Sequence, residues 1–405
     1  MPRRRPRRTF GVRAALYYLL CWSVIGLLVP AAIGGWWLVL ALAIATTAPL
    51  IAFISQGGWR AYPTATFRLL IVRPVLYTQL LLPLVAGGGL LGMIAGAPFG
   101  ATITGGRVGA LIVLGAMTLL LTVGYFGSGR LVRRQVEVSV PGLPPEWDGV
   151  RIAQISDLHV GPQTSRRFLA HVASTVTGLA PDAIAITGDL VDDRSEDVMH
   201  FAAAIDGLRA PLGVYLIPGN HDVYAGWDEV ESQLRTMLPN ATLLVNDARI
   251  LSRNGAQLAI VGTGDPAGRG GPASVAPDID RALRSVPSGT TVIALAHNPA
   301  LWPALAERGV ALTLSGHTHW GQFALPRLGW SLASPFMARA MGAHSEGDAL
   351  LYINPGTGYW GVPFRIGAGP EVTLVTLRPG PRAAIAAGHA ARAACESRTH
   401  AAGAA

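Results

Sequence analysis

The sequence predicts an α/β domain preceded by four transmembrane helices. Two observations lead to this prediction: the first third of the chain is apolar and lacks acidic residues, and the remainder alternates strand-like with helix-like segments. The charges divide in the same way. Residues 1–135 hold 13 arginines and no Asp or Glu, whereas residues 136–378 hold 16 arginines and 23 acidic residues. We therefore expect a boundary near Gln135.

Four uncharged apolar segments precede this boundary, at residues 14–32, 33–54, 75–95 and 108–126. Each is close to the roughly 20 residues that a transmembrane helix needs. Buried helices of a soluble domain are the alternative, but four in succession without an acidic residue argue against it. The run Gly87-Gly88-Gly89 suits close packing between membrane helices. We expect a basic N-terminal segment at 1–13 and a membrane domain at 14–130.

Arginines predict the orientation of these helices. They concentrate at the N-terminus, in the second connection and after the fourth helix: Arg3, Arg4, Arg5, Arg7, Arg8, Arg13, Arg60, Arg68, Arg73, Arg130, Arg133 and Arg134. Because positive residues favour the cytoplasmic side, we expect a multi-pass protein of the bacterial inner membrane with a cytoplasmic α/β domain. The pair Arg7-Arg8 also resembles the start of a twin-arginine export signal. Four membrane helices argue against such a cleaved segment.

The α/β domain is expected at residues 136–378, with a disordered Ala-rich tail at 379–405. Helices are predicted at about 166–178, 196–208 and 227–238. Strands are predicted at 136–140, 150–155, 183–187, 214–217, 241–245, 258–261, 291–295, 310–314, 350–353 and 372–377. The two cysteines, Cys21 and Cys395, indicate neither a disulfide framework nor a zinc-thiolate site.

Five polar clusters follow the strand-like segments of this domain. They are Asp157-Leu158-His159, Gly188-Asp189, Gly219-Asn220-His221-Asp222, His297-Asn298 and Gly316-His317-Thr318-His319. Loops at the carboxyl ends of strands converge in α/β sheets, so these side chains are expected to meet. Residues two apart on an extended segment point to the same side, as in the pairs Asp157/His159 and His317/His319. The glycines at 188, 219 and 316 are expected to let the backbone turn sharply.

Each cluster alone has an ordinary explanation. Asp-x-His is common by chance, Asp189 is a possible helix cap, Asn220 is a turn residue, and His297 is a possible hydrogen-bonded core histidine. The pair of histidines at 317 and 319 is the least ordinary. Five such clusters in this order, each after a strand, are hard to explain by coincidence. They indicate a site for metals that accept imidazole, carboxylate and amide ligands, such as Mn, Fe or Zn.

This series of motifs resembles the calcineurin-like metallophosphoesterase superfamily, over about residues 150–378. The segments Thr187-Gly188-Asp189-Leu190-Val191-Asp192 and Ser315-Gly316-His317-Thr318-His319, with Gly321-Gln322, are similar to the bacterial branch of membrane-associated phosphodiesterase-like proteins. That branch includes enzymes that cleave the pyrophosphate of UDP-diacylglucosamine. The resemblance implies a four-layer α-β-β-α sandwich and does not extend to the membrane helices.

The resemblance also implies a site with two divalent metal ions. Asp157, His159, Asp189 and His319 would hold the first ion, and Asp189, Asn220, His297 and His317 the second, with Asp189 bridging. Such ions share a hydroxide that attacks phosphorus. His221 would stabilise the developing charge or protonate the leaving oxygen. Asp222 would orient His221, although a turn aspartate is the alternative.

Two positions depart from the bacterial branch, which has glycine where this chain has Trp320 and often an arginine near Asn354-Pro355-Gly356. Trp320 either narrows the pocket, provides a stacking surface for a base or acyl chain, or packs as part of a lid. Arg365 is a candidate for the missing cation that contacts a substrate phosphate, and a surface arginine is the alternative. Both are therefore candidate substrate-binding residues.

The predicted function is a membrane-bound phosphodiesterase or pyrophosphatase. The membrane helices favour a lipid-linked substrate, although a phosphorylated small molecule remains open. The acidic catalytic region argues against nucleic acid as a partner. Uncharged membrane helices argue against transport. A non-catalytic membrane sensor or scaffold that binds metal or ligand is the alternative function, but every position that the resemblance requires is filled.

Overall fold

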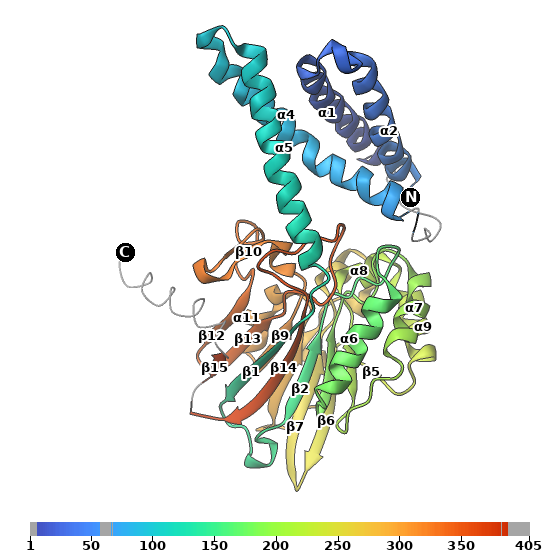
Figure 1. The fold of residues 1–405 in the computed structure, drawn as a ribbon. Coiled ribbons are helices and arrows are strands. Elements are labelled where there is room, and N and C mark those ends of the chain that lie inside the picture. Colours follow the sequence, from blue (N-terminus) through green and yellow to red (C-terminus); the bar gives the residue numbers. More distant parts are fainter. Residues whose placement is uncertain (1–5, 57–65, 67, 382, 388–405) are drawn as a thin grey trace. The chain divides into compact units, whose positions relative to one another are not determined.

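The computed structural model describes residues 6–56, 66, 68–381 and 383–387. The chain forms two compact units, Met1–Val123 and Gly124–Ala405. Figure 1 shows that the first is helical and the second is built from sheets and helices. This division lies within the last predicted membrane helix, about ten residues before the boundary expected from the charge pattern. Several arginines used to predict orientation, including Arg3 and Arg60, lie outside the described residues.

The first unit contains the helices α1 (Pro6–Leu28), α2 (Gly35–Gln56) and α4 (Arg73–Gly96), and most of α5 (Thr102–Gly127). Among the described residues, Leu70–Phe99 and Thr102–Gly127 are long and apolar enough to cross a membrane. Two further apolar helices, Leu16–Leu28 and Gly35–Pro49, are shorter than the roughly 20 residues of a full span. Two of the four predicted spans are therefore long and apolar enough to cross a membrane. That all four cross it stays a prediction.

Glycines lie where α4 and α5 approach each other most closely. A Cβ at Gly92 would collide with the backbone of Gly105, and one at Gly88 would lie 2.9 Å from the carbonyl of Gly109. Gly87 has no such neighbour. Small residues that bring two backbones together are typical of helix packing in membranes. The glycine-rich run of α4 is thus explained by Gly88 and Gly89 rather than by Gly87.

The second unit contains a seven-stranded sheet in the order β15-β1-β14-β2-β3-β4-β5. Its strands are β1 (Val132–Val140), β2 (Arg151–Ile155), β3 (Ala183–Thr187), β4 (Val214–Ile217), β5 (Thr242–Leu243), β14 (Glu371–Pro379) and β15 (Ala384–Ala387). The strands from β2 to β5 are parallel, so their carboxyl ends lie at one edge. That edge holds three of the five polar clusters.

The second sheet has six strands in the order β12-β13-β9-β8-β7-β6. They are β6 (Asp247–Arg253), β7 (Ala256–Gly262), β8 (Thr291–Leu295), β9 (Leu312–Ser315), β12 (Gly342–Glu346) and β13 (Ala349–Ile353). The central strands β7, β8, β9 and β13 are parallel. A separate hairpin pairs β10 (Ala324–Leu325) with β11 (Trp330–Ser331).

The two sheets pack face to face with helices outside them. One apolar cluster joins residues of both sheets, including Ile152 and Tyr215 of the first and Ile293 and Leu314 of the second. A second cluster packs α6 (Arg166–Gly178), α7 (Val198–Ile205) and α9 (Trp227–Met237) on the first sheet. A third packs α10 (Ile279–Leu283) and neighbouring residues on the second sheet, near α11 (Trp302–Ala306). The helix-sheet-sheet-helix order agrees with the expected α/β sandwich.

Four buried elements have the bounds that were predicted, several others differ by one or two residues, and three edge strands were not predicted. The bounds of α6, β3, β4 and β8 are those expected, because buried apolar runs mark them. The edge strands β6, β12 and β15 were not predicted, since their residues are polar or small. β15 pairs with β1, so residues 384–387 of the tail predicted as disordered form a strand. Residues 388–405 lie outside the described residues.

Candidate metal centre

The seven predicted metal ligands come from both sheets and meet at their carboxyl edges. Asp157 and His159 follow β2, Asp189 follows β3, and Asn220 begins α8 (Asn220–Tyr224) after β4. From the second sheet, His297 follows β8, and the pair at 317 and 319 follows β9. Side-chain contacts join the two sets, as Nε2 of His297 lies 3.3 Å from Oδ2 of Asp189. The sequence patterns therefore placed all seven residues in one location.

Five of these residues have left-handed backbone conformations that non-glycine residues rarely adopt. Their φ angles are +52° at Asp157, +43° at His159, +49° at Asp189, +71° at His317 and +49° at His319. Such conformations typically cost about 1 kcal/mol or more each and concentrate at functional sites. This concentration at the strand exits indicates that the loops are shaped to aim side chains inward, at a cost to stability.

Glycines serve this site in two ways. Gly188 has φ +84°, as expected for a sharp turn. Gly219 has an extended backbone with φ −114°, so its role does not depend on a left-handed conformation. A Cβ there would collide with the carboxylate of Asp189, and one at Gly316 would collide with that of Asp157. Both glycines are needed because a carboxylate packs directly against the backbone.

The first group of ligands surrounds the Nε2 atoms of His159 and His319, which lie 2.9 Å apart. Nε2 of His319 is 3.4 Å from Oδ1 of Asp157, and Nε2 of His159 is 3.5 Å from Oδ2 of Asp189. All four side chains are buried. Asp157, His159 and His319 thus present one ligand atom each within the span of a single cation.

The second group shares Asp189 with the first. Oδ1 of Asn220 lies 2.7 Å from Nδ1 of His317 and 3.3 Å from Nε2 of His297. The other ring nitrogen of His297 lies 2.8 Å from the carbonyl of Thr187, which orients the ring. A ring N–H held by a carbonyl leaves Nε2 as the ligand atom, an arrangement common in metal sites. This group therefore matches the second expected ligand set.

The electrostatics keep Asp189, His317 and His319 in forms that bind metal, whereas His297 has a raised pKa in the metal-free protein, because Asp189 outweighs the effect of burial. Burial by itself raises the pKa of Asp189, but His297, His159 and His221 outweigh it and hold that pKa below its usual range. Burial lowers the pKa of His317 to about 4, and the charge of His297 adds to the shift. Burial also places the pKa of His319 well below its usual range, helped by Arg365. At neutral pH, Asp189 is ionised and both histidines are neutral.

His221 lies at the side of the first group, and its partners differ from the expected one. Its Nδ1 is 2.7 Å from the carbonyl oxygen of Asp192 and 3.5 Å from the Asp192 carboxylate. The carboxylate of Asp222 instead accepts hydrogen bonds from the backbone N–H groups of Gly219, Leu190 and Val191. The expectation that Asp222 orients the His221 ring is therefore corrected: Asp222 ties together the exits of β3 and β4.

Asp192 is a candidate functional residue that sequence reasoning left out. Its Oδ1 also lies 3.4 Å from Nδ1 of His159, which has no hydrogen-bond partner among the described residues. The same carboxylate thus faces a predicted metal ligand and the predicted catalytic histidine. Its position three residues after Asp189 was visible in the sequence, where the segment from Thr187 to Asp192 was used only for the family resemblance and Asp192 was given no role.

Trp320 packs in the core rather than facing the site. Its ring is 6% exposed, lies among Trp302, Met341 and Leu351, and donates its indole N–H to the carbonyl of Ile353 at 3.0 Å. These contacts agree with the packing alternative and oppose an exposed stacking surface. The expectation of a substrate-contacting Trp320 is corrected accordingly.

Arg365 is fully buried and holds the loops behind His319. One guanidinium nitrogen donates to the carbonyls of His319, Pro355 and Ala368. The other contacts Nδ1 of His319 at 2.9 Å and donates to the carbonyl of Gly358. Burial lowers its pKa to about 10. With its terminal nitrogens bonded to protein carbonyls, Arg365 is a positioning residue, and neither of its two expected roles agrees with this placement.

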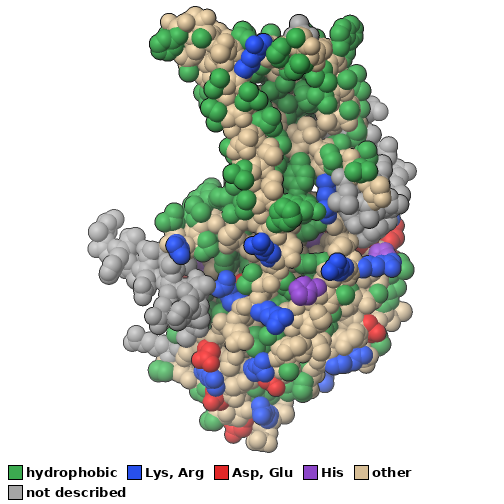
Figure 2. Space-filling view, in the orientation of Figure 1, with side chains coloured by type: hydrophobic (Ala, Val, Ile, Leu, Met, Phe, Trp, Pro, Cys, Tyr) green, Lys and Arg blue, Asp and Glu red, His purple; other side chains and the backbone are tan. Residues whose placement is uncertain are grey.

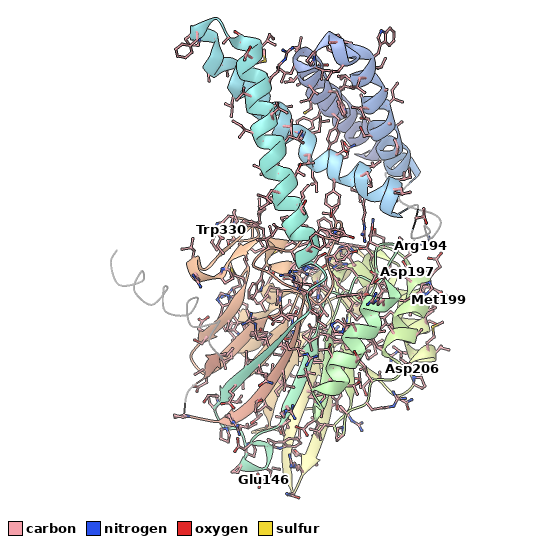
Figure 3. The ribbon with its side chains drawn as sticks, viewed as in Figure 1. Glu146, Arg194, Asp197, Met199, Asp206 and Trp330 are labelled. Carbon is pink, nitrogen blue, oxygen red and sulfur yellow. The ribbon has the colours of Figure 1, made fainter. Side chains whose placement is uncertain are left out.

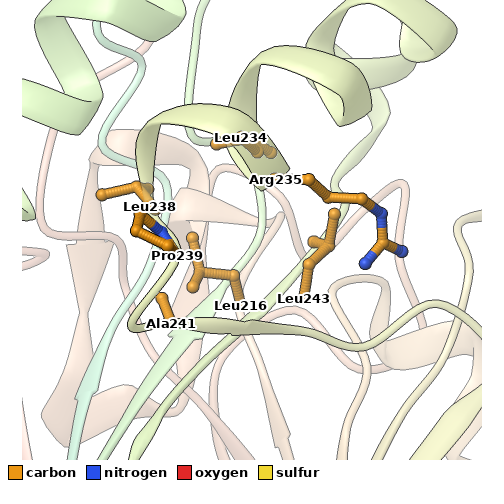
Figure 4. Close-up of a pocket in the computed structure, with 7 residues that line it drawn as sticks. All are labelled: Leu216, Leu234, Arg235, Leu238, Pro239, Ala241 and Leu243. Carbon is orange, nitrogen blue, oxygen red and sulfur yellow. The ribbon is translucent and has the colours of Figure 1, made fainter.

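One hollow of the second unit lies apart from these residues. It has a volume of about 220 Å³ and is lined by residues of α9, β4, β5 and their connections, including Leu234, Leu238 and Leu243 (Figure 4). None of its lining residues is a predicted ligand. The chemistry is therefore assigned to the polar strand ends and not to this hollow.

Comparison with known proteins supports the assignment of this chain to the metallophosphoesterases. The calcineurin-like phosphoesterase family matches residues 150–321. An uncharacterized metallophosphoesterase of Helicobacter pylori (strain J99) is 32% identical over 264 residues, which cover 64% of this chain and 69% of that protein. The uncharacterized metallophosphoesterase YkuE of Bacillus subtilis is 31% identical over 242 residues, which cover 58% of this chain and 82% of that protein.

A Danio rerio protein named as a transmembrane protein with a metallophosphoesterase domain is 32% identical over 252 residues, or 60% of this chain and 56% of that protein. The chain thus spans just over half the length of this relative. The matched region contains every cluster of the metal centre up to His319, and the family name agrees with the ligands gathered there. The chain belongs to the calcineurin-like metallophosphoesterase family.

Proposed function

We propose that this protein is a membrane-bound phosphodiesterase or pyrophosphatase that uses two divalent metal ions, with manganese as the first to test. One observation supports this proposal most directly: seven side chains form two ligand groups that share Asp189. Two ions held there would supply an activated water and stabilise charge on the phosphoryl oxygens. The fit rests on the structure, because the two Nε2 atoms 2.9 Å apart and the adjacent carboxylates form a set of N and O donors.

The chain's own residues supply the other parts of the reaction. His221 lies beside the first ligand group, and its backbone N–H donates to Oδ1 of Asp189 at 2.8 Å. Burial lowers the pKa of the His221 ring, but Asp193, Asp189 and Asp192 outweigh it and raise the pKa to about 9. A protonated ring at neutral pH is suited to donate a proton to the leaving oxygen. Asp192 would hold the ring in position for this transfer.

The substrate proposed is a lipid-linked or nucleotide-lipid pyrophosphate, similar to those cleaved by UDP-diacylglucosamine pyrophosphatases. Two apolar helices and the name of the Danio rerio relative support membrane association. An α/β domain joined to such a helix stays close to the bilayer, where substrates of this kind reside. We further propose four spans in the bacterial inner membrane, with the catalytic domain in the cytoplasm.

Hydrolysis of bis-p-nitrophenyl phosphate by the detergent-purified full chain tests the core of this proposal. The protein is stripped of metal, reloaded with Mn²⁺, and compared with Asp189→Asn and with Asp206→Asn, an exposed carboxylate that directly follows α7 and belongs to none of the strand-end clusters (labelled in Figure 3). Activity should return with Mn²⁺ in the wild type and in Asp206→Asn but not in Asp189→Asn. Metal binding without hydrolysis of this diester or of lipid pyrophosphates would favour a sensor or scaffold instead.

A further inference from the structure

The segment that follows the last metal-ligand cluster exposes an unusual number of large apolar side chains. They are Leu325, Leu328, Trp330, Leu332 and Phe336, which we call the apolar hairpin surface because it is built on β10, β11 and the residues after them. Phe336 is 86% exposed and Leu328 is 74% exposed. Figure 3 labels Trp330 at the edge of this hairpin. Single exposed apolar residues are ordinary, whereas a contiguous group marks an interaction surface.

The charges around this surface favour an anionic partner. The sequence contains no acidic residue between Glu307 and Glu346, but it includes Arg327 and Arg339 within that segment. Arg327 is exposed in the turn between β10 and β11, directly beside Leu328. Figure 2 shows hydrophobic side chains gathered over the region of β10 on the second unit, Gly124–Ala405, which we call the catalytic unit. An apolar surface with a Trp and an exposed arginine, Arg327, at its border is typical of protein that contacts the headgroup region of a bilayer.

Hydrogen bonds anchor this surface close to the point where the chain leaves a candidate membrane span. The backbone N–H of Arg365 donates to the carbonyl of Gly124, which belongs to the last turn of α5 and to the catalytic unit. The next residue, Ile366, pairs with Phe323 and accepts a hydrogen bond from Ala324 of β10. Two consecutive residues, Arg365 and Ile366, therefore connect the end of α5 to the start of the hairpin.

The same surface continues toward the catalytic histidine. Gln322, the residue before Phe323, exchanges two hydrogen bonds with the backbone of Trp360, each 3.0 Å long. The ring centroid of Trp360 lies 6.2 Å from that of His221, and Tyr224 lies 5.6 Å from it on another side. Both aromatic side chains are more than half exposed. Exposed aromatic groups thus extend from the hairpin to the proposed reaction site.

We propose that the apolar hairpin surface inserts into the headgroup region of the lipid bilayer and holds the metal centre against it. The tether through α5 keeps the catalytic unit at the membrane, and the hairpin selects which of its edges faces the lipid. Docking would bring Trp360 and Tyr224 within reach of a lipid substrate. This last consequence rests on the proposed function, whereas the docking itself does not.

Depth-dependent quenching tests the docking in the full chain. In a background with Cys21→Ala and Cys395→Ser, an environment-sensitive fluorophore is attached at Leu328→Cys or Phe336→Cys. The control is Ser252→Cys, an exposed residue near the β6–β7 turn, which lies at the opposite end of the catalytic unit (Figure 1). The protein is reconstituted in phosphatidylcholine–phosphatidylglycerol vesicles that contain nitroxide-labelled lipid. We expect a loss of fluorescence at 328 and 336 but not at 252.

Substitution within the surface makes the result specific. Leu328→Glu, added to the Phe336→Cys protein, should weaken quenching at 336, because a carboxylate opposes insertion into an anionic bilayer. Equal quenching at 328, 336 and 252, or none at 328 and 336, would overturn the proposal. Shielding of these labels in detergent without lipid would also overturn it, since a second copy or the chain's own helices would then cover the surface. Quenching requires no activity, so a failed hydrolysis assay leaves this test unaffected.

Discussion

The Nε2 atoms of His159 and His319 lie 2.9 Å apart, although the two residues are separated by 160 positions and belong to loops of different sheets. Carboxylate oxygens of Asp157 and Asp189 lie within 3.5 Å of one or the other. A cation shared by these four side chains would stabilise the close approach of the two rings. We therefore expect His319→Ala to lower the bound metal from about two ions to about one per chain. Inductively coupled plasma mass spectrometry measures the content, with Asp206→Asn as the control, and unchanged content would contradict the assignment.

The contact between His221 and Asp192 predicts a dependence on the leaving group. A general acid contributes roughly 10²- to 10⁴-fold, and most when the leaving oxygen is basic. Changing His221→Ala should therefore reduce kcat more for an alkyl phosphodiester than for bis-p-nitrophenyl phosphate, and Asp192→Asn should show a smaller loss of the same kind. Metal content should stay at the wild-type value in His221→Ala. An equal loss for both substrates would assign His221 to another role.

The raised pKa of His221 predicts the alkaline limit of the reaction. Because the ring donates a proton only when protonated, kcat for a diester with a poor leaving group should fall as the pH rises through about 9. Asp193 contributes to raising this pKa. In Asp193→Asn, the alkaline limb should therefore move to lower pH. The kcat–pH profiles of the wild type and of Asp193→Asn measure this alkaline limb. An unchanged alkaline limb in the variant would show that His221 is not the general acid.

Burial of Asp197 predicts that the metal-free protein loses stability as the pH rises. Desolvation raises the pKa of this carboxyl from 3.8 to about 7, and one of its oxygens has no hydrogen-bond partner among the described residues. The folded state therefore keeps a proton on Asp197 that the unfolded chain releases between about pH 4 and pH 7, so the contribution of this group to stability is highest below this range and falls through it. Asp197→Asn should flatten this dependence.

Thermal melting of metal-stripped protein in detergent, at pH 5 and pH 8, measures the effect. The wild type and Asp206→Asn should melt at clearly lower temperature at pH 8, while Asp197→Asn should show a smaller difference. A variant with the wild-type difference would show that Asp197 ionises in the folded state without penalty. Figure 3 shows both acidic residues on the catalytic unit.

The burial of Trp320 predicts a structural rather than a kinetic effect. Replacing a buried Trp with Ala typically costs about 3–5 kcal/mol, because a cavity remains and the indole hydrogen bond to Ile353 is lost. We expect Trp320→Ala to lower the melting temperature but to leave KM for a lipid pyrophosphate within about twofold of the wild type. A large rise in KM at a temperature where the variant is folded would instead indicate that Trp320 contacts the substrate.

Most of the metal centre was predictable because local sequence determines it. A buried apolar run followed by Gly188-Asp189, or by Gly316-His317-Thr318-His319, marks a strand and the carboxyl end at which its polar residues emerge. In parallel sheets these ends meet, so the order of clusters along the chain was sufficient to predict a common site. The division of the ligands into two sets came from the family resemblance.

What the sequence did not predict depends on contacts between distant segments. Asp222 follows a histidine in the chain, yet its carboxylate faces the backbone of residues 190 and 191 from β3's loop. Arg365 lies among aromatic residues in the sequence, but its guanidinium is enclosed by carbonyls of two loops, the one after β9 and the one between β13 and β14. The residues next to Asp222 and Arg365 in the sequence form no pattern that would predict these contacts with residues 190 and 191 or with His319. The edge strand β12 escaped prediction because its residues are half-exposed and lack alternation.

The ligands of the second group come from β4 in one sheet and from β8 and β9 in the other, so the centre spans the seam between the two sheets. Ions bound there would link the two sheets, which are otherwise joined mainly by apolar packing. Cells starved of the metal would then hold a chain that is looser at this seam and more easily cut by proteases. Metal supply would in this way set the lifetime of the protein as well as its activity.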